Sequence, residues 1–144
     1  MKRLSLLLAL ALLGLLVAAP SVQAAPPATP FTGAWIGQDP DPPNGDSSTL
    51  HLLIGLGTKP AIAFIDEFGT ICVNVGSPVT LFTSALTGTV SGNTLDATFR
   101  VAKCGPVPLL FLFGSPISWE YDDQGTANPA DDTLFDGVVF LHRD

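Results

Sequence analysis

The sequence predicts an all-β fold, namely an antiparallel up-and-down meander that closes into a small barrel of seven or eight strands. Short runs of β-branched and aromatic residues recur along the chain, and Gly, Pro, Asn and Asp separate them. No long stretch keeps a helical period without a Gly or Pro inside it. Most expected turns are short, which favours hairpins between sequential strands, and barrel closure removes the exposed sheet edges. A β-sandwich is the alternative.

The individual strands follow from alternation and from turn residues. Residues 49–56 carry Leu or Ile at every second position, which indicates a half-buried strand. The clearest hairpin joins 79–90 to 94–102 through the turn at 91–93. A polar loop separates the first two strands, and an acidic loop at 122–132 precedes the last. The expected strands are 31–37, 49–56, 61–66, 70–75, 79–90, 94–102, 109–113 continued at 117–121 after a bend, and 133–142.

Residues 1–24 have the pattern of a secretory signal peptide. Lys2 and Arg3 supply a positive start, the apolar run 4–19 follows, and small residues precede a cleavage position at Ala24. The apolar run is shorter than the ~20 residues that span a bilayer, so we expect no transmembrane segment in the mature chain. The expected organisation is a signal peptide at 1–24, a Pro-rich leader at 25–30, and one barrel-like domain at 31–144, secreted or periplasmic.

The two cysteines, Cys72 and Cys104, predict one intramolecular disulfide. Export places the chain in an oxidising compartment, where an even cysteine count indicates a bridge. A zinc site is disfavoured, because the cysteines are far apart in sequence and no C-x-x-C pair is present.

Charge and composition narrow the classes of partner. The chain has 144 residues, a 47% hydrophobic fraction and a 13% charged fraction, which fit one folded domain and exclude a disordered chain. The net charge of −7 leaves no surplus of Lys and Arg to neutralise phosphates, which argues against nucleic acid.

Two apolar runs, 109–113 and 138–141, depart from the alternation of a half-exposed strand. Such runs either bury both faces of a strand or leave apolar surface outside. The first interpretation is a strand covered by a loop or by the leader. The second is a contact between subunits of a homo-oligomer, or a wall shared between a cavity and such a contact.

The motif Gly33-Ala34-Trp35, on the first expected strand, resembles the start of the lipocalin and avidin-like (calycin) barrels. The resemblance implies that Trp35 packs at one barrel end against a basic residue from the last strand, and Arg143 stands at that place. A longer set of segments, including 33–37, 64–66, 88–95 and 121–123, looks like secreted bacterial β-domains that carry no assigned activity.

Two acidic loops contain hard oxygen ligands of the kind that Ca²⁺ prefers. Their spacing does not match an EF-hand, and Asp and Asn are also turn residues, so solvated turns are the favoured interpretation. No cofactor and no other metal is expected. The weak calcium candidates are Asp39, Asp41, Asp46, Asp122, Asp131 and Asp132.

The sequence predicts a protein that is not an enzyme. Its two histidines, His51 and His142, stand outside any recognised nucleophile or metal motif. Asp66 and Glu67 are adjacent, so on a strand they would point to opposite faces, which is poor geometry for a paired-carboxylate glycosidase.

An apolar pocket inside the barrel is the last candidate, because a barrel of about eight strands can hold one small ligand. An ordinary packed core is the favoured alternative. The function expected is non-catalytic binding of a small apolar ligand or of a partner surface, with a structural or adhesive envelope module as alternative. The residues that could line the pocket are Phe64, Phe82, Phe99, Phe111 or Phe113, Trp119 and Phe140.

Overall fold

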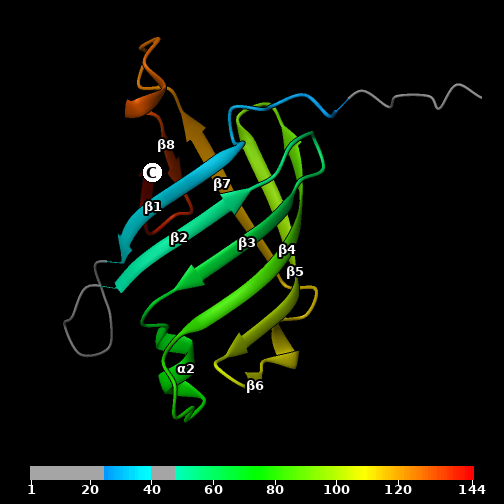
Figure 1. The fold of residues 1–144 in the computed structure, drawn as a ribbon, viewed down its shortest axis with the longest axis vertical. Coiled ribbons are helices and arrows are strands. Elements are labelled where there is room, and N and C mark those ends of the chain that lie inside the picture. Colours follow the sequence, from blue (N-terminus) through cyan, green and yellow to red (C-terminus); the bar gives the residue numbers. More distant parts are fainter. Residues whose placement is uncertain (1–24, 40–47) are drawn as a thin grey trace, which may run out of the picture.

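The structure, a computed structural model, describes residues 25–39 and 48–144 (Figure 1). The expected signal peptide at 1–24 and the calcium candidates Asp41 and Asp46 lie outside the described residues.

Eight antiparallel strands close into a barrel, which confirms the expected meander. Each strand pairs with the next along the chain, and β9 pairs back onto β1. A two-residue strand, β6 (Val107–Pro108), adds a short extension to β5. The eight barrel strands are β1 (Gly33–Asp39), β2 (Ser48–Ile54), β3 (Ala61–Asp66), β4 (Phe82–Ser91), β5 (Thr94–Cys104), β7 (Pro116–Asp122), β8 (Thr133–Phe135) and β9 (Phe140–Arg143).

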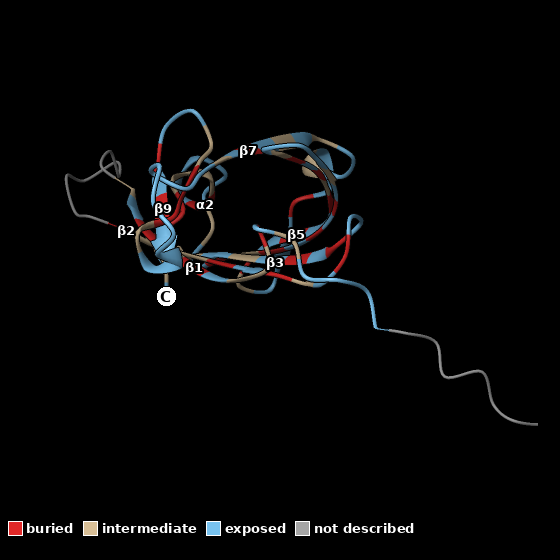
Figure 2. Cartoon of the chain, turned by 90° about the horizontal axis from the view of Figure 1, so that it is seen from above, coloured by how far each residue is buried: buried red, intermediate tan, exposed pale blue. Residues whose placement is uncertain are grey.

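Side chains alternate between the barrel interior and the outer surface. On β5, Leu95, Ala97 and Phe99 are buried, whereas Asp96 and Arg100 between and after them are exposed. A register shift between Ala85 and Leu86 of β4 interrupts the alternation of β5, so that Arg100 and Val101 are both exposed and Ala102 is buried again. Seen from above, the strands enclose a flattened ring, with β1 and β3 on one side and β7 opposite (Figure 2).

Three of the expected strands are wrong. Residues 70–75 form a short helix, α2 (Thr70–Asn74), although they are rich in β-branched residues. The helix places Cys72 in the core, and Gly76, with φ of +69°, follows its end. Tertiary context therefore overrides local propensity here.

The other two errors concern the apolar runs. Residues 109–113 contain a 3₁₀ helix, η1 (Leu110–Leu112), in place of a strand. The expected strand 133–142 is two strands, because Asp136 and Gly137 build a tight turn between β8 and β9. The Asp136 carboxylate accepts hydrogen bonds from the Val138 and Val139 N–H groups, at 2.9 and 2.8 Å, and Gly137 adopts φ of +98°.

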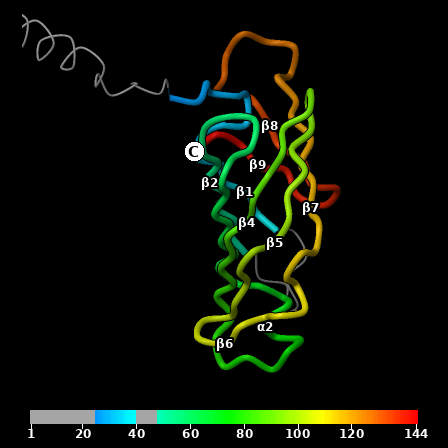
Figure 3. The backbone as a smooth tube through the Cα atoms, turned by 90° about the vertical axis from the view of Figure 1, so that its right-hand side faces the viewer, coloured from blue at the N-terminus to red at the C-terminus, as the bar shows by residue number. Residues whose placement is uncertain are grey.

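The two ends of the barrel carry different elements. The helix α2 and the strand β6 lie at one end, and the described N-terminal segment lies at the other (Figure 3). A third short helix, η2 (Pro129–Asp131), belongs to the acidic loop that follows β7.

Candidate binding surface

At one end of the barrel, the structure brings Trp35 and Arg143 together. The indole is buried, and its Nε1 donates a hydrogen bond to the Phe31 carbonyl at 2.8 Å. The guanidinium carbon of Arg143 lies 4.1 Å from the centroid of the indole ring. This stacked arrangement follows from the register, because Trp35 of β1 pairs directly with Arg143 of β9.

Arg143 also contacts residues that are far apart in the sequence, near the first strand and in the acidic loop. Its Nη1 donates to the Thr32 carbonyl at 2.6 Å, and its Nη2 lies 3.3 Å from a carboxylate oxygen of Asp132. Asp132 is only 3% exposed, so its charge is compensated inside the protein. Burial, then a hydrogen bond to Asp132 and the charge of Asp132, raise the pKa of Tyr121. We will call this region the Trp35 end.

Four of the six aromatic pocket candidates point into the barrel and touch one another. Phe64 lies 6.0 Å from Phe82 and 6.5 Å from Trp119 between ring centroids, and Phe82 lies 6.3 Å from Phe99. Because Phe64 comes from β3 and Trp119 from β7, these rings bridge the interior between opposite walls. The Nε1 atom of Trp119 is buried without a hydrogen-bond partner.

The other two candidates, Phe111 and Phe140, lie on the outside of the barrel. Phe140 stacks on Phe135 of the neighbouring strand, with ring centroids 4.4 Å apart. The alternation of β9 explains its position, because Leu141 takes the inward place.

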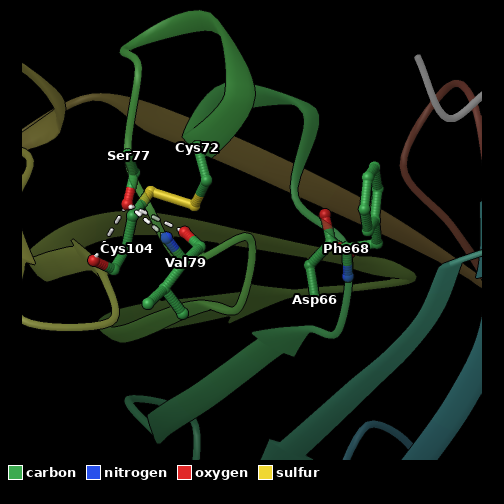
Figure 4. The surroundings of a disulfide bond; sticks show 6 residues. All are labelled: Asp66, Phe68, Cys72, Ser77, Val79 and Cys104. Carbon is green, nitrogen blue, oxygen red and sulfur yellow. Dashed lines mark hydrogen bonds between the residues drawn. A yellow bond between two sulfur atoms is a disulfide. The ribbon is translucent and has the colours of Figure 1, made fainter. Parts of the chain in front are cut away.

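The opposite end of the barrel is closed by the Cys72–Cys104 disulfide (Figure 4). Both cysteines are fully buried, and the bond ties α2 to the end of β5. The Ser77 hydroxyl donates to the Val79 carbonyl at 2.8 Å and contacts the Cys104 carbonyl at 3.5 Å. The Gly105 N–H donates to the Leu81 carbonyl at 3.0 Å, so the two segments are held together on both sides of the bridge. We will call this region the disulfide end.

The 3₁₀ turn η1, which follows the disulfide end of β5, exposes large apolar side chains. Leu110, Phe111 and Phe113 are 79%, 63% and 66% exposed, whereas Leu109 between them and the barrel is buried. Backbone hydrogen bonds fix the turn, from Leu112 N to Leu109 O at 3.1 Å and from Gly114 N to Phe99 O at 2.9 Å. The apolar groups are therefore presented on a braced backbone.

The segments that carry the exposed apolar side chains of the disulfide end contain no charged residue, although Asp66, Glu67 and Lys103 stand beside them in the sequence. Residues 68–95 and 104–119 contain no Asp, Glu, Lys, Arg or His, although the whole chain has a net charge of −7. Further exposed apolar side chains lie in the same segments. They are Val73, Val75, Val79, Leu81 and Val107. A surface that is apolar and free of charge can be buried against a partner without desolvating an ion.

The described calcium candidates do not gather in one place. Two accept hydrogen bonds within the acidic loop, one faces Arg143, and one lies on β1. Asp122 accepts a hydrogen bond from the Gln124 N–H at 2.8 Å, and Asp131 accepts from the Thr126 hydroxyl at 2.9 Å. Asp132 faces Arg143, and Asp39 is the last residue of β1. No group of three or more His, Cys, Asp or Glu side chains within the described ranges could hold a metal ion.

The two histidines lie closer together than their sequence positions indicate. His51 of β2 and His142 of β9 both pair with Ile36 of β1, so they share one row of the outer wall. His51 Nε2 lies 3.1 Å from a carboxylate oxygen of Glu67, and both side chains are exposed.

Asp66 lies near the disulfide end and receives hydrogen bonds from neutral groups. The Ser48 hydroxyl donates to its carboxylate, and the Phe68 N–H donates to it at 3.0 Å. Burial is the main cause that raises the pKa of Asp66; the negative charges of Asp39 and Glu67 add to it, and the two hydrogen bonds oppose it.

Comparison with known proteins gave no relative for this chain. No family model matches it, and no match was found among curated proteins or solved structures. Within the residues that the structure describes, no helix has the length and apolar character to cross a membrane.

Sequence reasoning identified the apolar run 109–113 but not its exposure on a turn. The exposure of Phe111 and Phe113 depends on the turn η1, and other exposed apolar side chains of the disulfide end come in part from α2, more than thirty positions earlier in the chain. The signal that could have located this surface is the absence of charge from 68–95 and 104–119.

Proposed function

We propose that this chain is an exported, non-catalytic binding module on a calycin-like barrel, and that it binds a partner through the apolar disulfide end. The observation that carries the proposal is the exposure of Leu110, Phe111 and Phe113 on one braced turn. Water-exposed Phe and Leu side chains each contribute about 1.5–3 kcal/mol when fully buried. Aromatic side chains that protrude from a fixed backbone are typical anchors of protein interfaces.

Export is supported by the disulfide and by the signal-like segment at 1–24. The calycin-like assignment is supported by the eight-stranded meander and by the stacking of Arg143 on Trp35. Intact mass measurement of the protein recovered from its own host tests the export step. We expect a mass that begins at Ala25 and lacks two hydrogens for the disulfide. A mass that includes residues 1–24 would contradict it.

The binding surface is tested by photo-crosslinking in the native host. A photoreactive phenylalanine analogue replaces Phe111 in one strain. In a control strain it replaces Asn93, which lies in the turn between β4 and β5, at the end of β5 away from Cys104. We expect one defined crosslinked protein from position 111 and none from position 93. Added wild-type protein should compete for the crosslink, whereas the double variant Phe111→Ser/Phe113→Ser should not.

The double variant also controls for folding. Its free energy of unfolding should stay within about 0.5 kcal/mol of the wild type, because both side chains are exposed. Crosslinks that wild-type protein fails to displace, or equal crosslinking from both positions, would refute binding at the disulfide end.

A second candidate function, binding of a small apolar ligand inside the barrel, is favoured by one observation. The Trp119 Nε1 donor is buried without a partner, and a buried donor normally finds an acceptor in protein, water or ligand. Native mass spectrometry of protein taken from its own host tests this function. A retained small mass that is lost in Trp119→Phe would support it, and a bare protein mass would count against it.

A further inference from the structure

The outer surface of the first four strands has an unusual composition for a barrel wall. On β1 to β4, the side chains that point outward include no Asp, Glu, Lys or Arg among the described residues. Soluble proteins normally place their charges at such positions. These outward residues are Ala34, Ile36, Gln38, Thr49, His51, Leu53, Ala61, Ala63, Ile65, Thr83, Ala85, Thr87 and Thr89.

One row of this wall is apolar from β1 to β5, and we call it the central row. Strand register places Ala34 beside Leu53, Leu53 beside Ala63, Ala63 beside Ala85, and Ala85 beside Val101. Leu53 and Val101 are 59% and 54% exposed, and the three alanines are exposed as well. Large and small residues therefore stand on opposite sides of Ala63.

A shallow, open depression lies beside Ala85. It is lined by Thr83, Ser84, Ala85, Val101 and Lys103, where β4 and β5 come together near the register shift. Leu53, on the other side of Ala63, protrudes from the same wall.

From this pattern we infer that two copies of the chain associate face to face through the central row. A two-fold axis perpendicular to the walls cannot bring them face to face. An axis that lies between the two walls and runs along β3 does so, and it sets the strands on one side of Ala63 against the strands on the other side in the second copy. Leu53 of each copy then falls on the depression at Ala85 of the other copy, and Val101 falls on Ala34. The two Ala63 residues meet at the axis, where their small side chains allow the sheets to approach closely.

The composition and the area of the central row both fit a second copy. The row itself contains no charged residue, so its burial desolvates no ion. The charged side chains beside it are Glu67, which lies 3.1 Å from His51, and Lys103 on β5. Five strands at ~4.8 Å spacing, over three outward positions per strand, cover about 500 Å² on each copy. The total of about 1,000 Å² meets the lower limit for a specific interface, so we expect a weak dimer.

Sedimentation equilibrium of the full purified chain, over protein concentrations from about 1 to 200 µM, tests the dimer. We expect the wild type to dimerise and Leu53→Asp to raise the dissociation constant at least about 30-fold, because the new charge would be buried. The control Leu110→Asp, at the disulfide end, should leave the dissociation constant unchanged. A wild type that stays monomeric, a Leu53→Asp variant that dimerises normally, or a dimer lost in Leu110→Asp would each overturn the inference.

The geometry of the contact is tested by exchanging the large and the small residue. Leu53→Ala removes the protruding side chain, and Ala85→Leu fills the depression, so each change alone should weaken the dimer about tenfold. The combined variant Leu53→Ala/Ala85→Leu again sets a large side chain against a small one across the axis, and it should return to within about threefold of the wild type. Additive weakening in the combined variant would overturn this arrangement. Circular dichroism of each variant checks that it folds.

Discussion

The two ends of this barrel are closed in different ways. At the Trp35 end, an indole, a guanidinium group and a buried carboxylate pack together, and Phe31 and Trp35 are almost completely hidden from water. At the disulfide end, one covalent bond joins α2 to β5, and large apolar side chains remain exposed around it. Closure by packing buries the apolar side chains of a barrel end. Closure by a covalent bond leaves such side chains exposed, so that they can contact another molecule.

The largest effect should come from removing the covalent closure. In the double variant Cys72→Ser/Cys104→Ser, the unfolded chain gains the freedom of the segment between the two positions, and the folded state should lose about 3–4 kcal/mol. Urea unfolding followed by Trp fluorescence measures the loss. Wild-type protein unfolded in the presence of a reductant is the matched control and should behave like the variant. A loss below about 1 kcal/mol would mean that packing alone holds the disulfide end together.

The second effect concerns the Trp35 end, where no covalent bond compensates for a lost contact. Arg143→Met leaves Asp132 buried without its cation and frees the Thr32 carbonyl, so we expect a loss of about 3 kcal/mol. Adding Asp132→Asn to this variant should recover part of the loss, because the uncompensated charge disappears. Urea unfolding of the two single variants and the double variant gives the coupling energy between the side chains. A double variant as unstable as the sum of the singles would show that the two residues do not act as a pair.

Alternation was the sequence feature that predicted this fold best. Residues 94–102 alternate, and β5 has the expected inward face over Leu95, Ala97 and Phe99. The strands at 70–75 and 109–113 were wrong for two different reasons. The first has high β-propensity but serves to position Cys72, and the second has no alternation that could assign one face to the core.

The candidate surfaces were less predictable than the strands. The contact between Trp35 and Arg143 came from a family resemblance, because nothing in their spacing indicates that the first and last strands pair. The central row depends on the register of four strand pairs and on an irregularity near Ala85. Since a shift of one residue turns every side chain to the other face, such a row is not defined before the register is known.

The smallest expected effect on stability concerns two carboxylates, Asp132 at the Trp35 end and Asp66 near the disulfide end. Asp132 faces a cation, whereas the hydrogen bonds to Asp66 come from the Ser48 hydroxyl and the Phe68 N–H. Because burial raises the pKa of Asp66 in the folded state, ionisation of this group opposes folding. The cost is absent at pH values below the unfolded pKa of an aspartate, about 3.9, and it is complete above the raised folded pKa.

Asp66→Asn keeps an oxygen that can accept both hydrogen bonds but removes the charge. The melting temperature of the variant should equal that of the wild type at about pH 3 and should exceed it increasingly as the pH rises from about 4 to 7. Asp132→Asn, measured over the same range, should show the opposite sign at about pH 7, because it removes the charged partner of Arg143. If Asp66→Asn lowers the melting temperature at neutral pH, the charge of Asp66 stabilises the fold, and both ends then depend on a buried anion.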